Sequence, residues 1–223
     1  MTSTRTTARR WPALAALGAG LLGALAPALA ADPVAPPTEL TKVRIETSLG
    51  SFVIQLETVR APLTSMNFIN YVKAGQYSGT LFHRVINNFI AQGGGYDEKF
   101  ELKAVGKPVA NESGNGLSNK RGTVGLARSE APHSGNAQFY VNLTDNEDLD
   151  PTPLRWGYAV FGKVVEGMDI VERIGRTPTG ATGPWTRDAP LESVVIKRAE
   201  ILGAVPPPLA DAPPPPPTPP PSK

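Results

Sequence analysis

The stretch FHRVINNFIAQGG, residues 82–94, places an arginine and a glutamine among mostly apolar residues. Alternate side chains of an extended chain point to opposite faces. Arg84 therefore shares a face with Ile86, and Gln92 shares a face with Ile90 on the return strand. The pattern allows two interpretations. Arg84 could pair with an acid on a solvated sheet, or one fixed cation and several amides could face an apolar pocket that binds a small group.

The usual catalytic patterns do not occur in this sequence. Its two histidines, His83 and His133, are not in the H-x-x-x-H spacing of a zinc site. No G-x-S-x-G motif is present, and Ser134 beside His133 is too isolated a pair to indicate a triad. The dinucleotide-type fingerprint GAGLLG at 18–23 has no strand before it. We therefore expect neither a metal ion nor another cofactor. A hydrolase that uses His83 or His133 is the least supported of the functions considered for this sequence.

The N-terminus has the three parts of an export signal. A start with three arginines precedes an apolar run over 11–29, and Ala28-Leu29-Ala30 provides a small-residue cleavage site. The run is short and rich in Gly and Ala, which favours a cleaved signal over a membrane anchor. We expect a signal peptide at 1–30, cleavage before Ala31, a periplasmic location and no stable membrane span after cleavage.

Charge and composition narrow the classes of partner. Residues 1–30 contain three of the 22 Lys and Arg residues and none of the 20 Asp and Glu residues, so the mature chain has a net charge of about −1. This balance argues against nucleic acid as a partner. The chain has no cysteine, which excludes disulfides and thiolate metal sites.

Proline-rich segments mark the two ends of one folded unit. Eleven of the 24 prolines lie between Pro206 and Pro221, in a segment without apolar periodicity, as in extended polyproline. We predict a linker at 31–40, one domain at 41–202 and a disordered proline-rich tail at 203–223.

The domain is expected to be mainly β. Alternating apolar residues predict a hairpin over 42–56, and apolar residues three and four apart predict helices over 63–75 and 166–175. Short strands are predicted at GTLFHRVI (79–86), FIAQGG (89–94), GTVGLA (122–127), QFYVNL (138–143), YAVFGKVV (158–165) and SVVIKRAEIL (193–202). Many short strands with two helices indicate an antiparallel barrel or sandwich.

Several motifs in this order resemble the cyclophilins, the peptidyl-prolyl cis-trans isomerases, and particularly their bacterial members. They are FHRVINNFIAQGG (82–94), NESGNGLSNKRGTVGLAR (111–128), APHSGNAQFYVNL (131–143) and WGYAVFGKVVEGMDIV (156–171). The resemblance extends from Lys42 to Ile201 and implies a closed eight-stranded antiparallel β-barrel capped by two α-helices.

The resemblance also implies the residues of the site. Arg84 matches the catalytic arginine of the family, and Phe89 and Gln92 complete the catalytic set. The implied substrate-binding residues are Ile90, Ala127, Arg128, Gln138, Phe139, Tyr140, Leu149 and Tyr158. Tyr140 stands where the family usually has phenylalanine. Asp148 stands where the family has an aromatic residue at the pocket rim, so cyclosporin binding is expected to be weak.

The implied reaction is isomerisation of Xaa–Pro bonds (EC 5.2.1.8) in unfolded or flexible polypeptides, by a monomer that assists the folding of exported proteins. Such a bond takes on the order of tens to hundreds of seconds to isomerise unaided. A donor directed at its nitrogen stabilises the twisted state selectively, and the implied donor is Arg84. Two alternatives remain open: a barrel that binds proline without catalysis, and a protein whose tail, as a spacer or ligand, has the main role.

Overall fold

The structure is a computed structural model that describes residues 40–207. The expected signal peptide, all but the last residue of the linker, and the tail from residue 208 onward lie outside this range. Within the described range, no helix combines the length and the apolar character that crossing a membrane requires.

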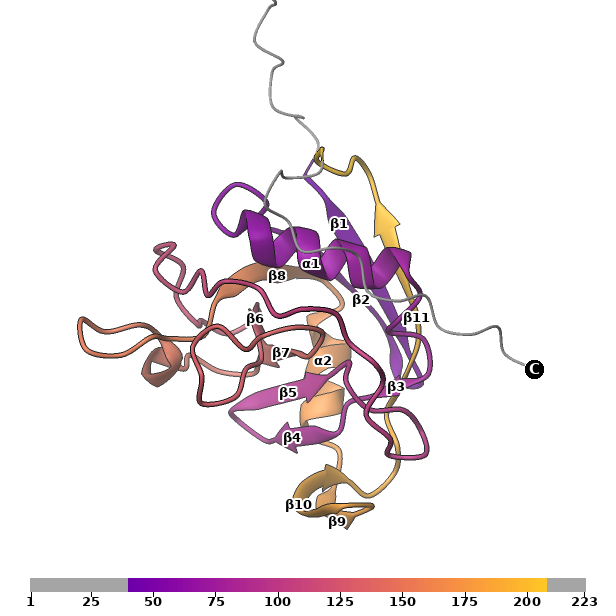
Figure 1. Ribbon diagram of the computed structural model, residues 1–223. Coiled ribbons are helices and arrows are strands. Elements are labelled where there is room, and N and C mark those ends of the chain that lie inside the picture. The colour runs from indigo at the N-terminus through magenta and orange to yellow at the C-terminus, as the bar shows by residue number, and fades with distance from the viewer. Residues whose placement is uncertain (1–39, 208–223) are drawn as a thin grey trace, which may run out of the picture. The chain divides into compact units, whose positions relative to one another are not determined.

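A curled antiparallel sheet of nine strands is the largest element of the described chain (Figure 1). Neighbouring strands follow the order β3-β11-β1-β2-β8-β6-β7-β5-β4. The strands are β1 (Lys42–Thr47), β2 (Gly50–Leu56), β3 (Thr80–Leu81), β4 (Arg84–Ile86), β5 (Ile90–Gly93), β6 (Thr123–Leu126), β7 (Phe139–Asn142), β8 (Val160–Glu166) and β11 (Val195–Leu202). The mainly β class and the hairpin predicted over 42–56 are confirmed.

The sheet differs from the expected closed eight-stranded barrel. It has nine strands, and within residues 40–207 no ladder joins its end strands β3 and β4. These two strands are parts of the single run predicted over 79–86, which changes partner from β11 to β5. At the change, the N–H of Phe82 donates to the carbonyl oxygen of Val194 (2.9 Å). The sheet therefore curls until its two ends meet along the chain, without a ladder that closes it.

Helix α1 (Pro62–Lys73) contacts β8 and β11. Proline suits its first turn because an N–H there has no partner within the helix. The carboxylate of Glu112 accepts hydrogen bonds from the N–H groups of Leu63 (3.0 Å) and Thr64 (2.8 Å), which satisfies two such donors. Gly75, with φ of 68°, follows the helix end, where glycine is common because it adopts positive φ without strain.

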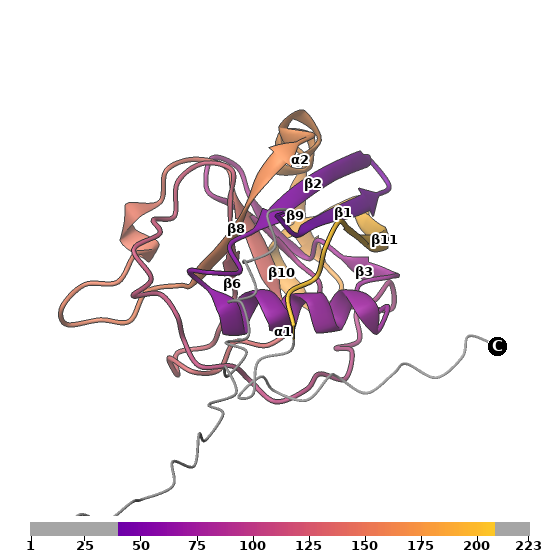
Figure 2. The ribbon, with the colours of Figure 1, turned by 90° about the horizontal axis from the view of Figure 1, so that it is seen from above.

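Helix α2 (Met168–Gly175) contacts β2, β4 and β5. Figures 1 and 2 show the two helices on opposite sides of the curled sheet. Between them lies the core, whose largest fully buried side chains include Phe52, Ile54, Phe68, Phe82, Phe139 and Phe161. Both helices were predicted from the sequence, with ends that differ by up to two residues.

A second, two-stranded sheet was not predicted. It consists of β9 (Thr179–Thr182) and β10 (Trp185–Pro190), and β10 contacts β4. Its sequence, TGATGPWTRDAP, has no apolar alternation. Trp185 lies against His83 of the first sheet, with ring centroids 5.5 Å apart and a 30° angle between the rings.

Candidate active site

Three side chains from neighbouring strands form one row across the sheet. In the ladders, Arg84 of β4 lies opposite Gln92 of β5, and Gln92 lies opposite Tyr140 of β7. The adjacent row on the same strands is apolar and fully buried: Val85, Ala91 and Val141. Since side chains alternate along a strand, the row with Arg84 belongs to the other face of the sheet, away from the core.

The turn between β4 and β5 holds this register. Asn88 has φ of 56°, in the left-handed region that asparagine tolerates, and the N–H of Phe89 donates to the carbonyl oxygen of Ile86 (3.0 Å). A turn at Asn87-Asn88 therefore joins the two strands. A slip of one residue would move every side chain to the wrong face, so this turn brings the arginine opposite the glutamine.

Amide side chains orient the arginine. Nη1 of Arg84 donates to Oε1 of Gln92 (3.4 Å), and Nε2 of Gln92 donates to Oε1 of Gln138 (3.0 Å). Among the described residues this is the one hydrogen bond of the Arg84 side chain, and no ion pair involves it. The interpretation in which Arg84 pairs with an acid is thus not observed. The remaining guanidinium N–H groups have no hydrogen-bond partner among the described residues.

Tyr158 lies next to Tyr140, which ends this row. Their ring centroids are 6.1 Å apart, with an interplanar angle of 81°. Tyr140 is almost fully buried, which raises the pKa of its hydroxyl well above the usual range, with contributions from Tyr158 and Asp150. The hydroxyl is therefore protonated at neutral pH and acts as a donor to Oδ1 of Asn119 (2.6 Å).

Arg128 packs against this pair. Its guanidinium carbon lies 4.4 Å from the centre of the Tyr158 ring. Its N–H groups donate to the carbonyl oxygens of Ser129, Glu130, Trp156 and Gly157. Most of these donors are used within the protein, and the expectation that Arg128 binds substrate stays a prediction.

Two further expected residues lie in the loops beside the row. The N–H of Ala127 donates to the carbonyl oxygen of Gln138 (2.9 Å). Leu149, half-buried, ends the short 3-10 helix η1 (Glu147–Leu149), and its carbonyl oxygen accepts a bond from the N–H of Tyr158 (2.9 Å). Both residues therefore lie on segments bonded directly to residues of the site.

Phe89 and Ile90 begin the return strand. Phe89 is half-buried in the turn, and its carbonyl oxygen accepts bonds from Leu143 N–H and from Nδ2 of Asn146 (2.9 Å each). Ile90 is 4% exposed, on the face of β5 that carries Gln92. These contacts attach the start of β5 to the loop that follows β7.

Phe139 does not belong to the site. It is fully buried, and its ring lies 5.5 Å from those of Phe68 and Tyr77 and 5.9 Å from that of Phe82. Phe139 and Tyr140 are consecutive on β7, so they point to opposite faces. The expectation that Phe139 binds substrate is therefore wrong: its side chain is part of the core.

His83, the residue before Arg84, is buried among aromatic side chains. It is 5% exposed and packs against Tyr96 and Trp185, whose rings also contact each other. Burial, assisted by the charge of Arg84, lowers the pKa of His83 to about 4. Within residues 40–207, no group of three or more His, Cys, Asp or Glu side chains is arranged to hold a metal ion.

Sequence reasoning missed three buried asparagines close to the site. Asn119, Asn142 and Asn146 hydrogen-bond to one another and to residues around the site. Asn119 lies in the loop before β6, and the other two follow four residues apart at and after the end of β7. No spacing rule indicates such a cluster, because it joins segments that are distant in the sequence.

The fold and this row of side chains define a class of protein. The family model described as "Cyclophilin type peptidyl-prolyl cis-trans isomerase/CLD" matches residues 42–201. The chain therefore belongs to the cyclophilin-type peptidyl-prolyl cis-trans isomerase family.

Curated bacterial relatives agree with this assignment. The chain is 45% identical over 167 residues to peptidyl-prolyl cis-trans isomerase cyp18 of Streptomyces antibioticus, covering 74% of this chain and all of that protein. It is 42% identical to isomerase A of Dickeya dadantii, covering 81% of this chain and 92% of the relative. Identity to isomerase B of Escherichia coli is 43%, with 71% and 98% covered.

Solved structures show the same fold. A cyclophilin type isomerase from Cryptosporidium parvum, crystallised in the presence of the dipeptide Ala-Pro, aligns with a TM-score of 0.60 at 24% identity, covering 73% of this chain and 99% of that one. Cyclophilin AquaCyp293 from Hirschia baltica aligns with a TM-score of 0.58 at 22% identity, covering 71% and 73%.

Proposed function

We propose that this protein catalyses cis–trans isomerisation of Xaa–Pro bonds in flexible polypeptide segments. The observation that carries the proposal is the row of Arg84, Gln92 and Tyr140, in which the cation is held by an amide and not neutralised by an acid. Family membership and relatives named peptidyl-prolyl isomerases support it.

The chemistry needs no nucleophile and no cofactor. The amide barrier is ~18–20 kcal/mol because the C–N bond has partial double-bond character. As the bond twists, conjugation is lost and its nitrogen becomes a hydrogen-bond acceptor. An N–H of Arg84 directed at this nitrogen binds the twisted state better than either planar state, which is the condition for acceleration.

The magnitudes are sufficient for a useful catalyst. A 10⁴-fold acceleration corresponds to about 5.5 kcal/mol. One preorganised donor in a site shielded from water supplies roughly 3–4 kcal/mol, and holding the chain in a twisted pose adds ~1–5 kcal/mol. In this proposal the proline ring lies on Phe89, Ile90, Tyr140 and Leu149, and Gln92 holds a substrate carbonyl.

The direct test is the exchange rate of an Ala-Pro peptide, measured by NMR with the purified mature protein. Acceleration over the uncatalysed rate is the expected result. A folded protein that binds the peptide without accelerating exchange would instead be a proline-binding module. The exposed Asp148, in place of an aromatic rim residue, is the feature that favours this second function.

The substrates we propose are proline-containing unfolded or flexible chains in the periplasm, where the protein would assist the folding of exported proteins as a monomer. The basic, apolar and small-residue parts of segment 1–30 support export. Fractionation of expressing cells and N-terminal sequencing test this proposal. We expect a periplasmic protein that begins at Ala31, and an uncleaved protein in the membrane fraction would contradict it.

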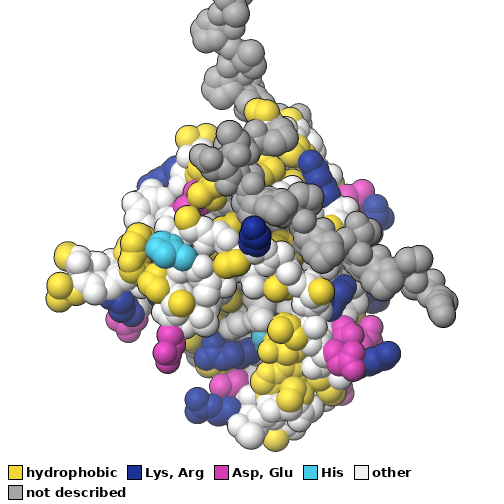
Figure 3. All heavy atoms as spheres, viewed as in Figure 1, with side chains coloured by type: hydrophobic (Ala, Val, Ile, Leu, Met, Phe, Trp, Pro, Cys, Tyr) yellow, Lys and Arg dark blue, Asp and Glu magenta, His cyan; other side chains and the backbone are white. Residues whose placement is uncertain are grey.

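The surface charge fits polypeptide clients better than nucleic acid. On the face shown in Figure 3, Lys and Arg side chains alternate with Asp and Glu and do not gather in one basic patch. Binding to a phosphate backbone relies on clustered positive charge. Together with the mature net charge of about −1, this distribution supports the proposed class of substrate.

A further inference from the structure

Asn119 is fully buried, and both polar atoms of its side chain are used twice. Oδ1 accepts hydrogen bonds from Oη of Tyr140 (2.6 Å) and Nδ2 of Asn142 (3.2 Å). Nδ2 donates to Oδ1 of Asp150 (2.8 Å) and to the carbonyl oxygen of Tyr158 (3.4 Å). One amide therefore joins Tyr140 of β7 to the segment that follows Leu149.

The backbone of Asn119 extends this connection. Its N–H donates to Oδ1 of Asp150 (2.8 Å), and its carbonyl oxygen accepts a bond from the N–H of Asn146 (2.8 Å). Nδ2 of Asn146 in turn donates to the carbonyl oxygen of Phe89 (2.9 Å). The segments that carry Phe89, Tyr140, Leu149 and Tyr158 are thus all bonded to Asn119, directly or through one residue.

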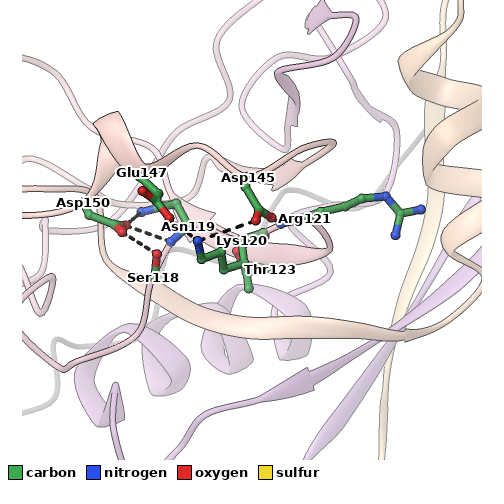
Figure 4. Close-up of polar contacts among 8 residues, drawn as sticks. All are labelled: Ser118, Asn119, Lys120, Arg121, Thr123, Asp145, Glu147 and Asp150. Atoms are coloured by element: carbon green, nitrogen blue, oxygen red, sulfur yellow. Dashed lines mark hydrogen bonds and ion pairs between the residues drawn. The ribbon is translucent and has the colours of Figure 1, made fainter.

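Ion pairs and hydrogen bonds fix the loop of Asn119 against the loop at 145–150 (Figure 4). Ser118 donates to the carboxylate of Asp150, and Lys120 pairs with Glu147 and with Asp145. Burial raises the pKa of Asp150, but the bonds from Ser118 and Asn119 outweigh it, so the pKa is below its usual value. The carboxylate that receives Asn119 is therefore ionised at neutral pH.

Gly125 provides the space for the bond between Tyr140 and Asn119. A Cβ atom at Gly125 would lie 2.2 Å from Cζ and 2.3 Å from Oη of Tyr140, far inside van der Waals contact. A side chain at this position would displace the tyrosine ring. Glycine at 125, tyrosine at 140 and asparagine at 119 therefore form one mutually dependent arrangement.

We propose that Asn119 is a positioning residue that preforms the apolar wall on which the substrate proline lies, an inference that rests on the proposed function. Its side chain bonds to Tyr140 and Tyr158, and its backbone and side chain hold the segment after Leu149. A preformed wall lowers the ordering cost of binding equally for planar and twisted substrate. Loss of Asn119 therefore weakens substrate binding and leaves the step at Arg84 nearly unchanged.

The test is a separate measurement of KM and kcat for Asn119→Ala. We expect KM to rise roughly tenfold and kcat to stay within about twofold, the pattern of lost uniform binding. Gln76→Ala is the matched control, because Gln76 is an equally buried amide whose side chain donates to the carbonyl oxygen of Ala104, away from the site. The control is expected to lower stability and leave KM unchanged.

A second variant, Asn119→Asp, keeps the size of the side chain. It tests the positioning role of Asn119 if the alanine variant does not fold. Its carboxylate would face that of Asp150, with the hydroxyl of Tyr140, the carbonyl of Tyr158 and the more distant ammonium of Lys120 around it. Repulsion is expected to raise KM at pH 8. As pH falls, the new carboxyl at position 119 and that of Asp150 share a proton. The shared proton restores a hydrogen bond between the two side chains, so KM should return toward the parent value at pH 5.

The outcomes separate this proposal from the proposed function. An unchanged KM in a folded Asn119→Ala protein, a fall in kcat like that of an Arg84 variant, or a pH-independent KM in Asn119→Asp would overturn the positioning role. If the parent protein accelerates no exchange, the proposed function fails instead. The dissociation constant of the same Ala-Pro peptide then tests Asn119, and equal values for parent and Asn119→Ala would overturn its role.

Discussion

Arg84 lies opposite Gln92 in the ladder of β4 and β5, with its Nη1 atom 3.4 Å from Oε1 of the glutamine. A neutral amide orients the guanidinium without cancelling its charge, whereas a carboxylate would do both. Gln92 is itself held by Gln138 at 3.0 Å. In the proposed reaction, this arrangement preserves the full positive charge with which Arg84 polarises an uncharged substrate.

Arg84→Ala should lower kcat/KM for an Xaa–Pro peptide by about 10²–10³-fold, the usual effect of removing one preorganised donor. The variant should stay folded, since Arg84 is only half-buried and pairs with no acid among the described residues. Arg44→Ala, on the exposed side of β1, is the matched control and should retain full activity. Equal activity in parent and Arg84→Ala would show that another group stabilises the twisted bond.

Gln92→Glu should also lower kcat/KM, by an estimated ten- to hundredfold, although the side chain keeps its size. The new carboxylate would form an ion pair with Arg84 and draw the guanidinium away from the substrate nitrogen, against the electrostatic requirement of the reaction. The measurement is the exchange rate at pH 7.5 with saturating and limiting peptide. Full activity in this variant would mean that the unpaired charge of Arg84 does not stabilise the twisted Xaa–Pro bond.

The order of strands and helices was predictable because it depends on local periodicity. The alternation of Val43 and Ile45 with polar residues, and the stripe through Val171 and Ile174, bury one face in each element. The break between β3 and β4 was not predictable from periodicity. It arises because the first part of one extended run pairs with β11 and the second part pairs with β5. The β9–β10 hairpin carries too little apolar pattern to be recognised.

The site could be predicted in part for a similar reason. Arg84, Gln92 and Tyr140 occupy one row because strand register follows from alternation and from the Asn87-Asn88 turn. The same alternation contradicts a substrate contact for Phe139, which matching a motif position by position does not reveal. Asn119 was missed, because buried polar groups find partners through tertiary contacts and leave no periodic signal.

Acid should destabilise the protein through His83, whose folded pKa of about 4 is below the 6.5 of an exposed histidine. The fold binds the neutral ring, so the stabilising contribution is fully present above pH 6.5 and is lost as pH falls toward 4. Linkage gives a loss of about 2.5 kcal/mol between pH 7.5 and 4.5. Urea unfolding at the two pH values measures this loss.

The variant His83→Phe isolates the contribution of this histidine. It keeps an aromatic ring against Tyr96 and Trp185 and removes the titration, so its unfolding free energy should fall less between the two pH values. His133→Gln, at the exposed second histidine, serves as the control and should behave like the parent. Asp145, Asp150 and Glu172, with lowered pKa values, lose their contributions in a lower pH range and do not mask the difference.

Cyclosporin should bind this protein weakly. Asp148→Trp should lower the dissociation constant for cyclosporin by about tenfold or more. Asp148 is exposed on η1. By the resemblance to the cyclophilins, this position usually holds an aromatic residue at the rim of the substrate pocket. Partial burial of an indole at ~25 cal/mol per Å² contributes about 1.5 kcal/mol, which is tenfold in the dissociation constant. Nη2 of Arg155 holds the loop by donating to the carbonyl oxygens of Asp148 (2.5 Å) and Asp150 (3.1 Å), so the backbone should tolerate the change.

Titration calorimetry measures the affinity for cyclosporin, with Glu98→Trp, in an exposed turn, as the control for a new surface indole. Equal gains in both variants would indicate non-specific adsorption, and no gain in Asp148→Trp would mean that η1 does not form the rim of the site.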